Sequence, residues 1–159
     1  MERLKKLEKS ARLKAILSFV EGRVLADIGT DHAYLPISAC LSSKVERAIA
    51  CDLNPAPLLK ARENIIKYRL QDRITTRLGY GLQPLQSGEA DTIVIAGIGG
   101  INIIEMLKDL PDDFRIQRLI IQPQRDIKAV RRALTDFSFV DEISVLENDR
   151  FYDIIVVKR

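Results

Sequence analysis

The segment 27–36, DIGTDHAYLP, places acidic and glycine residues directly behind a run of apolar residues. Gly29 permits a tight turn and a close approach of the main chain to a ligand. Asp31 stands where the phosphate-binding G-x-G-x-x-G pattern needs its second glycine, and a carboxylate repels a pyrophosphate. Acidic side chains suit a cationic ligand, and S-adenosylmethionine carries an ammonium and a sulfonium group without phosphate. The segment therefore favours a methyl donor over a dinucleotide.

Three further positions have both a ligand-binding and a structural interpretation. Asp52 ends the next apolar run, where its carboxylate can accept hydrogen bonds from ribose hydroxyls; it can also form an Asx turn ahead of Asn54, and both roles can coexist. The segment 79–82, GYGL, either contacts the edge of the donor's adenine or is a plain turn. His32 binds the donor's carboxylate, orients a substrate, or is a structural hydrogen-bonding residue.

The composition excludes several other kinds of site. His32 is the only histidine, and the two cysteines, Cys40 and Cys51, lie in apolar contexts without C-x-x-C spacing. A metal cage or a histidine-dependent hydrolase therefore has too few residues to be built from, and we expect no metal. No apolar run is long enough to cross a bilayer, and the amino terminus is charged, so we expect a cytoplasmic protein.

The ligand-binding segments must be positioned by regular elements, and hydrophobic periodicity predicts them. An amphipathic helix is expected from Leu4 to Val20, ended by Gly22. Asn54 followed by Pro55 predicts a helix start, with Asn as the N-cap. We predict further helices over about 34–41, 55–69, 101–110 and 126–135, and strands over about 23–28, 45–51, 74–77, 92–96, 118–122, 140–147 and 151–157.

This alternation predicts a doubly wound, Rossmann-like α/β fold with a seven-stranded sheet that ends in a β-hairpin. The 159 residues suit one domain, with an N-terminal helix over 1–21 and an α/β core over 22–159. Ligands bind such sheets at the carboxyl ends of the strands, where the winding reverses. The turns after the first, second and fourth strands should therefore meet at one ligand.

Positive charge is unevenly distributed along the chain. The net charge is +3, but residues 1–14 hold six Lys or Arg against two Glu. A second basic group lies between Arg118 and Arg132, where Asp126 is its main acidic neighbour. These groups are compatible with a polyanionic partner or, equally, with solvated helix faces.

Read together, several motifs make the chain resemble the bacterial tRNA (adenine-22-N1)-methyltransferases over almost its whole length. The motifs are SARL at 10–13, GTDHAYLP at 29–36, the 79–82 turn, IAGIGG at 95–100, QPQ at 122–124 and FY at 151–152. The resemblance implies a class I methyltransferase fold, S-adenosylmethionine as the cofactor and tRNA as the substrate.

The resemblance also implies roles for single residues. The donor site it implies comprises Asp27, Gly29, Asp31, His32, Tyr34, Asp52, Leu53, Tyr80, Gly81, Leu82 and Gly97. The residues that would position the methyl group and the target base are Asp31, Gly97, Gly99, Gln122, Pro123 and Gln124. For RNA phosphates we name Lys5, Lys9, Arg12, Arg125, Lys128 and Arg132, whose contacts should be sensitive to salt.

The chain departs from the family pattern at four points. Tyr80 replaces an acidic residue that would contact the adenine amino group, Ile98 replaces a common Met, and Gln124 replaces a frequent Asn. Family members also continue into a helical C-terminal region that helps to hold tRNA, whereas this sequence ends at Arg159. Without that region, we expect RNA to be held by the N-terminal helix and the basic residues of 118–132.

The implied reaction needs no strong general base, because adenine N1 already carries an in-plane lone pair. The protein would act by positioning and desolvation. Because N1 lies on the Watson–Crick edge, a paired base would have to be extruded, and we expect duplex RNA to be a poor substrate. Two alternatives stay open: a methyltransferase of the same fold that acts on a small molecule or a protein, and a non-catalytic RNA- or partner-binding module. The oligomeric state is also open.

Overall fold

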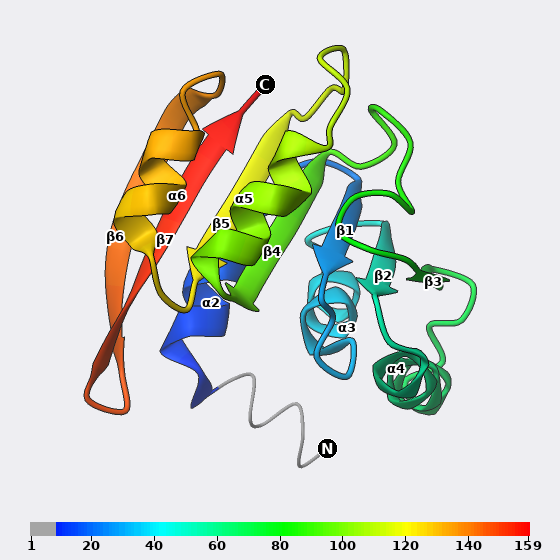
Figure 1. Ribbon diagram of the computed structural model, residues 1–159. Coiled ribbons are helices and arrows are strands. Elements are labelled where there is room, and N and C mark those ends of the chain that lie inside the picture. The colour runs from blue at the N-terminus through cyan, green and yellow to red at the C-terminus, as the bar shows by residue number, and fades with distance from the viewer. Residues whose placement is uncertain (1–8) are drawn as a thin grey trace.

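The computed structural model describes residues 9–159, which form a seven-stranded sheet in the order β3-β2-β1-β4-β5-β7-β6 (Figure 1). β1 to β5 run parallel, whereas β7 runs antiparallel to both β5 and β6. The strands are β1 Val24–Ile28, β2 Arg47–Asp52, β3 Ile74–Leu78, β4 Thr92–Ile98, β5 Arg118–Pro123, β6 Ser138–Glu147 and β7 Arg150–Lys158.

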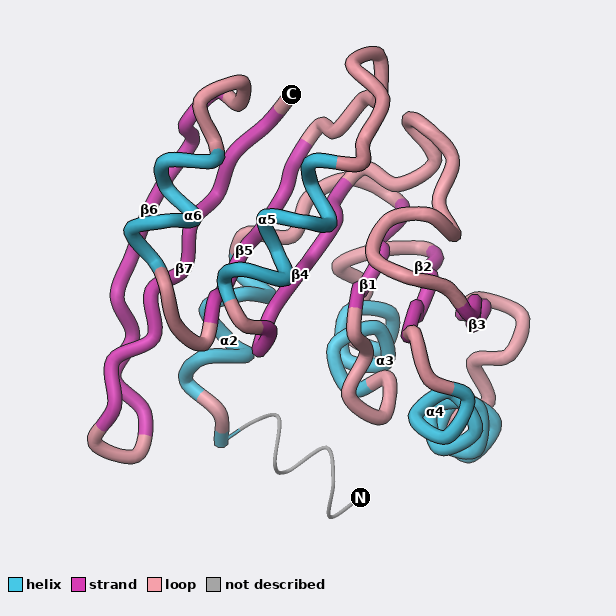
Figure 2. The backbone as a smooth tube through the Cα atoms, viewed as in Figure 1, coloured by secondary structure: helices cyan, strands magenta, loops and turns pink. Residues whose placement is uncertain are grey.

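Five helices cover the two faces of this sheet (Figures 1 and 2). They are α2 Ala11–Ser18, α3 Tyr34–Leu41, α4 Pro55–Lys67, α5 Gly100–Lys108 and α6 Ile127–Ala133. Ile16, Ile37 and Ile65 bury α2, α3 and α4 against one face. Ile103 and Val130 bury α5 and α6 against the other face. Both faces of the sheet are thus covered, and the carboxyl ends of the parallel strands are where a ligand can bind.

The sequences of the central strands are nearly continuous apolar runs because helices cover both faces of the sheet. Leu25 and Val94 contribute to the layer under α2 to α4, and Ala26 and Ile95 contribute to the layer under α5 and α6. These alternating directions follow from the two-residue period of a strand. The sheet is therefore apolar on both faces, and polar groups gather at its edge.

The predicted doubly wound fold and its terminal hairpin are confirmed, and all but one of the elements agree within two residues at each end. The exception is the N-terminal helix, expected to run without a break from Leu4 to Val20. Ser10 interrupts it: this residue has extended backbone dihedrals, and its side chain accepts a hydrogen bond from the Leu13 N–H as the N-cap of α2. The capping hydroxyl competes with helix continuation at that position. Lys5 and the start of the expected helix lie outside the described residues.

The sequence prediction included the hairpin but not its position. β7 pairs with β5, so that β6 forms the outer edge of the sheet. Because β7 is antiparallel to β5, the hairpin tip at 147–150 lies at the same edge as the carboxyl end of β5. The tip of the closing hairpin thereby lies at the same edge of the sheet as the turns after β1, β2 and β4.

Candidate functional site

Three hollows open side by side at the carboxyl ends of β1, β2 and β4, and together they form one crevice. The Gly97 hollow has a volume of about 270 Å³ and is lined by Arg12, Leu13, Asp27, Gly29, Asp31, Tyr34, Leu35, Ala96, Gly97 and Gln124. The Tyr80 hollow, about 420 Å³, is lined by Ile28, Gly29, Cys51, Asp52, Leu53, Gly79, Tyr80, Gly81, Ile98, Asn102 and Met106. The His32 hollow, about 300 Å³, is lined by Thr30, Asp31, His32, Asp52, Ala56, Pro57 and Lys60.

Gly29 stands at the centre of the crevice, where it lines both the Gly97 and the Tyr80 hollows. Its φ of +72° lies in the left-handed region that favours glycine. The N–H groups of Gly29 and Thr30 both donate to the Cys51 carbonyl at 2.9 Å, which ties the loop after β1 to the end of β2. This turn brings the main chain of Gly29 between the two hollows.

Asp27 is a buried carboxyl group in the wall of the Gly97 hollow. Its side chain is at the end of β1, and only 6% of the residue is exposed. Burial and, to a smaller extent, the nearby charges of Asp31 and Asp52 together raise the pKa of Asp27 to about 7. A cation in this hollow would favour the ionised form of Asp27.

Asp31 and His32 lie at the mouth of the crevice. The Asp31 carboxylate is 82% exposed and approaches His32 Nε2 at 3.3 Å. The His32 ring stacks on Tyr34 with a centroid distance of 5.1 Å, and its carbonyl accepts a hydrogen bond from the Asn64 amide at 2.9 Å. Within the described part of the chain, the buried Nδ1 of His32 has no hydrogen-bond partner. His32 thus has structural contacts, and one of its ring nitrogens is buried without a partner among the described residues.

Asp52 joins the Tyr80 and His32 hollows at the end of β2. Its Oδ1 accepts the Asn54 N–H at 2.9 Å, which confirms the Asx turn. Asn54 is the N-cap residue of α4, as predicted, but its side chain makes no capping hydrogen bond. The turn occupies one lone pair of Asp52 and leaves the other carboxylate oxygen available at the crevice. The next residue, Leu53, presents an apolar side chain that is 57% exposed.

The Tyr80 hollow has the apolar walls that a flat aromatic ligand needs. Gly81 has a φ of +54°, and a Cβ there would lie 2.8 Å from Met106 Cγ, so that glycine brings this turn against α5. Burial raises the pKa of Tyr80, with Glu105 and Asp109 acting in the same direction, so its hydroxyl stays protonated. Asn102 and Met106 also line the hollow. The sequence analysis missed both, because only the packing of α5 beside the 79–82 turn brings them there.

A chain of hydrogen bonds supports the far wall of the Gly97 hollow. The fully buried Gln122 accepts Arg12 Nη1 at 2.8 Å and the Gly97 N–H at 3.2 Å through its Oε1. Its amide nitrogen donates to the Pro123 carbonyl at 2.9 Å. A Cβ on Gly97 would meet the Gln124 amide at 3.7 Å and Arg12 Nη1 at 3.8 Å. Gln122 therefore holds the Gly97 backbone by a hydrogen bond from the buried side, whereas Gln124 and Arg12 border the Gly97 hollow itself.

Two residues named from the sequence place their side chains away from the crevice. Leu82 is 3% exposed and packs in the apolar layer under α5. It also lines a separate, mostly apolar groove beside Tyr80. Pro123 is buried within β5. Gly99 does not line the three hollows; it is the N-cap residue of α5, and a Cβ there would lie 3.5 Å from Arg125 Nε.

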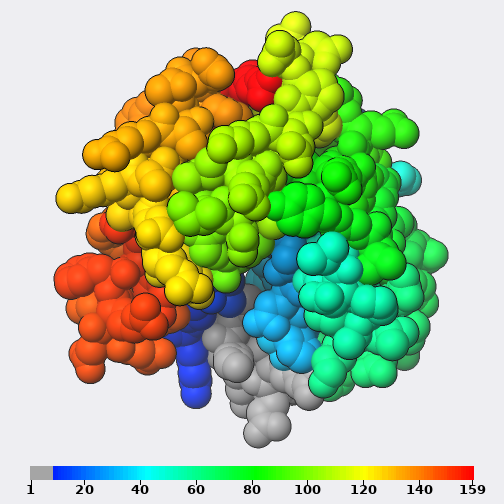
Figure 3. Space-filling model, in the orientation of Figure 1, coloured from blue at the N-terminus to red at the C-terminus, as the bar shows by residue number. Residues whose placement is uncertain are grey.

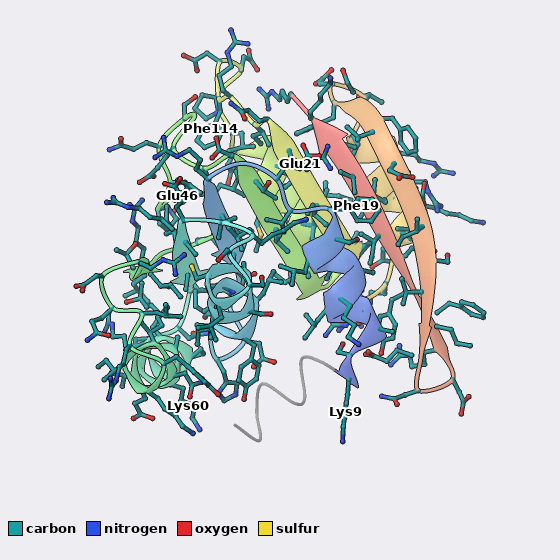
Figure 4. The ribbon with its side chains drawn as sticks, turned by 180° about the vertical axis from the view of Figure 1, so that it is seen from behind. Lys9, Phe19, Glu21, Glu46, Lys60 and Phe114 are labelled. Atoms are coloured by element: carbon teal, nitrogen blue, oxygen red, sulfur yellow. The ribbon has the colours of Figure 1, made fainter. Side chains whose placement is uncertain are left out.

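The basic residues divide into exposed and engaged groups. Lys9, Arg125, Lys128 and Arg132 are exposed, and Figure 4 shows Lys9 projecting from the start of α2. Arg12 is engaged: its side chain is only 22% exposed, contacts Gln122 and Glu147, and lies over the Tyr152 ring at 5.5 Å. Arg118 pairs with Glu21, and Arg131 pairs with Glu142. Arg12 is therefore part of the crevice wall, and the exposed residues are those that are free to meet phosphates.

Other kinds of site are not found in the described residues. Over 9–159, no group of three or more His, Cys, Asp and Glu side chains could hold a metal ion. A search of the same residues finds no helix with the length and apolarity that a membrane span requires.

Comparison with known proteins places these features in context. A family model described as "Methyltransferase domain" matches residues 9–155. The tRNA (adenine(22)-N(1))-methyltransferase of Bacillus subtilis is 36% identical over 159 residues, 98% of this chain and 67% of that protein. The chain thus spans about two thirds of the length of this relative.

Solved structures agree with the sequence comparison. The crystal structure of the B. subtilis m1A22 tRNA methyltransferase TrmK superposes with a TM-score of 0.89 at 37% identity, covering 94% of this chain and 65% of that one. TrmK from M. capricolum, solved with the cofactor product S-adenosylhomocysteine, gives a TM-score of 0.84 at 32% identity, with 94% and 68% covered.

Proposed function

Because the chain belongs to the methyltransferase domain family and, within it, to the tRNA (adenine(22)-N(1))-methyltransferases, we propose that it transfers a methyl group from S-adenosylmethionine to N1 of adenine 22 in tRNA. The observation that carries the proposal is the crevice around Gly29, where three carboxyl groups surround space for a cationic nucleoside: Asp27, Asp31 and Asp52. The family and the site chemistry thus support the same reaction.

In this proposal the Tyr80 hollow holds the adenosine part of the donor. The Asp52 oxygen left over from the Asx turn accepts ribose hydroxyl protons, as an acidic residue at this strand end does in dinucleotide folds. The exposed Leu53 side chain and the side chains of Ile98 and Met106 cover the faces of the adenine. The Tyr80 hydroxyl and the Asn102 amide supply polar contacts to the adenine edge, in place of the family's acidic residue.

The Gly97 hollow holds the methionine part of the donor and meets the target base. Asp27 and Asp31 provide negative charge for the ammonium and sulfonium groups. Asp31, which is exposed at the mouth, also faces the side from which a base would enter. Gln124 and Arg12 border this entrance, and the Gln122 hydrogen bonds hold the Gly97 main chain in place.

The chemistry requires positioning more than proton transfer. The N1 lone pair of adenine forms the new bond to the methyl carbon while the bond to the sulfonium sulfur breaks, so the positive charge moves from sulfur to the base. No proton has to leave N1 first, which agrees with a site that holds one histidine and no general-base pair. Asp31 lies close to the positive charge both before the transfer, when it is on sulfur, and afterwards, when it is on the base. The walls of the hollow restrict N1 to an in-line approach.

The proposed substrate also assigns a role to the exposed basic residues. Lys9, Arg125, Lys128 and Arg132 are exposed and free to contact phosphates. Lys5, which lies outside the described residues, belongs to the same proposal by its place in the basic N-terminal segment. The proposed tRNA substrate supports a cytoplasmic enzyme.

The test is methylation of an unmodified tRNA transcript, with the product nucleoside identified by mass spectrometry and its position mapped by primer extension. We expect 1-methyladenosine at position 22, and no product from a transcript that carries guanine there. A duplex oligonucleotide that pairs the same adenine should react at least tenfold more slowly, because extrusion of a paired base costs a few kcal/mol. Methylation of another nucleotide, or equal rates on the duplex, would reject the proposal.

A further inference from the structure

The tip of the β6–β7 hairpin is a rigid projection at the edge where the crevice opens. Asn148 and Asp149 form its two-residue turn with φ of +49° and +60°, the backbone of a tight hairpin connection. Ser10 Oγ donates to Glu147 Oε1 at 2.7 Å, and the Arg12 N–H donates to the same oxygen at 3.3 Å. These bonds fix the tip to the start of α2.

The hairpin tip also borders the path into the Gly97 hollow. A shallow groove of about 330 Å³ runs between them, lined by Lys9, Ser10, Arg12, Leu13, Asp31, Tyr34, Glu147 and Asn148. Arg12, Leu13, Asp31 and Tyr34 line this groove and the Gly97 hollow alike. A polymer that places one unit in the Gly97 hollow therefore passes close to the tip.

The two faces of the hairpin tip carry side chains in different surroundings. Tyr152 points towards α2, where Arg12 and Arg150 lie over its ring at 5.5 and 5.8 Å. Phe151 points to the opposite face, since successive side chains alternate along a strand. Phe151 is 73% exposed, the most exposed of the large apolar side chains in the described residues, and its cross-strand neighbour Leu146 is 56% exposed.

Exposed cations lie near the face that carries Phe151. Because β7 runs antiparallel to β5, the first residues of β7 lie beyond the carboxyl end of β5. The chain that leaves this end of β5 passes through Arg125 into α6. Figure 3 shows the hairpin tip and the segment before α6 on one face of the molecule. Arg125 is exposed in this segment and Lys128 in the first turn of α6, against Asp126 and Asp149. An exposed aromatic ring beside cations matches the pairing of base stacking and phosphate contact that unpaired RNA requires.

We propose that Phe151, with its cross-strand neighbour Leu146 beside it, is a stacking platform for an unpaired nucleotide that neighbours the methylated adenine. This inference rests on the proposed function, and it adds a binding site outside the donor crevice. The ring holds the neighbouring base while the exposed cations hold its phosphates. The platform thereby keeps the RNA strand open beside the Gly97 hollow.

The first test compares Phe151→Ala with Phe139→Ala in methylation of the tRNA transcript. Phe139 is a matched control: it is a 66% exposed phenylalanine of the same hairpin, at the opposite end of β6. Loss of one stacked base lowers kcat/KM for tRNA about tenfold in Phe151→Ala, whereas Phe139→Ala stays at the wild-type value. Binding of S-adenosylmethionine and the melting temperature stay unchanged in both variants, because each ring is exposed.

The second test uses fluorescence, since the chain contains no tryptophan. Phe151→Trp introduces a single indole whose emission is quenched when tRNA stacks on it, and Phe139→Trp shows no such quenching. Equal kcat/KM values for the two alanine variants would contradict the stacking platform, and so would Phe151→Trp emission that tRNA does not quench. In either case, methylation of tRNA by the wild type would still support the proposed function. An emission change that follows protein concentration without RNA would instead assign the tip to a contact between copies of the chain. A wild-type protein that neither binds nor methylates tRNA would reject both proposals.

Discussion

At the scale of single residues, the crevice is defined by carboxyl groups in three different environments. Asp27 is buried, Asp52 is half-buried and partly used by a turn, and Asp31 is exposed. The sequence suggested all three because acidic residues after apolar strands mark the ligand edge of such a sheet. The sequence could not show their different exposure, which is set by the packing of the loop after β1 against the end of β2.

The raised pKa of Asp27 predicts a pH dependence of donor binding. Because the pKa is about 7 in the ligand-free protein, Asp27 is largely neutral at pH 5.5 and largely ionised at pH 7.5. A cationic donor binds the ionised form better, so its affinity should rise across this range in a calorimetric titration. Asp27→Asn should abolish the rise. His32→Gln is the control, since a rise lost in that variant would assign the effect to the histidine.

The raised pKa of Asp27 also affects folding stability. Donor affinity should rise with pH, whereas the stability of the ligand-free protein should fall. Asp27 binds its proton more tightly in the folded than in the unfolded chain, where its pKa is near 3.8. Folding stability of the ligand-free protein therefore falls as pH rises from about 4 to about 7 at this residue. Asp27→Asn removes that loss, and its melting temperature relative to wild type should be higher at pH 8 than at pH 5.

At the scale of elements, most of the fold could be predicted from periodicity and end signals, and the N-terminal helix could not. The apolar runs of β1 and β4 and the Asn54-Pro55 start of α4 were readable because local pattern and final environment agree. The break at Ser10 comes with the capping hydrogen bond of its side chain, and the same hydroxyl also donates to Glu147, a residue 137 positions away. Arg12 was likewise assigned to RNA from its charge, whereas its contacts with Gln122, Glu147 and Tyr152 come from the long-range packing of α2 against the hairpin.

The link between α2 and the hairpin should matter for both stability and catalysis. Partial burial alone would raise the pKa of Glu147, but hydrogen bonds from Ser10 and the Arg12 main chain hold it below the ordinary value. Glu147→Gln should lower the free energy of unfolding by about 1–2 kcal/mol, measured by urea denaturation at pH 7. It should also lower kcat for tRNA methylation, because Arg12 loses an anchor beside the Gly97 hollow.

The matched control is Glu142→Gln, which removes the Arg131 ion pair between α6 and the same strand β6. Arg131 is half-exposed, so the loss should be below about 1 kcal/mol, with no change in kcat. Equal effects of the two substitutions on kcat would contradict a specific role for the contact between α2 and the hairpin.

At the scale of the whole molecule, the sheet arranges acidic and basic groups for two different ligands. Carboxyl groups lie inside the crevice, where the proposed donor is cationic, and the exposed cations Lys9 and Arg125 precede α2 and α6, where the proposed RNA is anionic. The composition alone gave only a net charge of +3 and left solvated helix faces as an equal alternative. The strand order brings the ends of β1, β2, β4 and β5 and the hairpin tip to one edge, which favours the polyanionic partner that we propose.

The central claim is that this crevice binds S-adenosylmethionine through Asp52, and calorimetric titration of the purified protein tests it most directly. The wild type should bind one donor per chain. Asp52→Ala should weaken binding about tenfold or more, since hydrogen bonds to a charged group are each worth about 1.5–3 kcal/mol. Asp72→Asn, at an exposed turn outside the crevice, should bind as the wild type does. Absence of donor binding by the wild type, or equal affinities for all three proteins, would contradict the account.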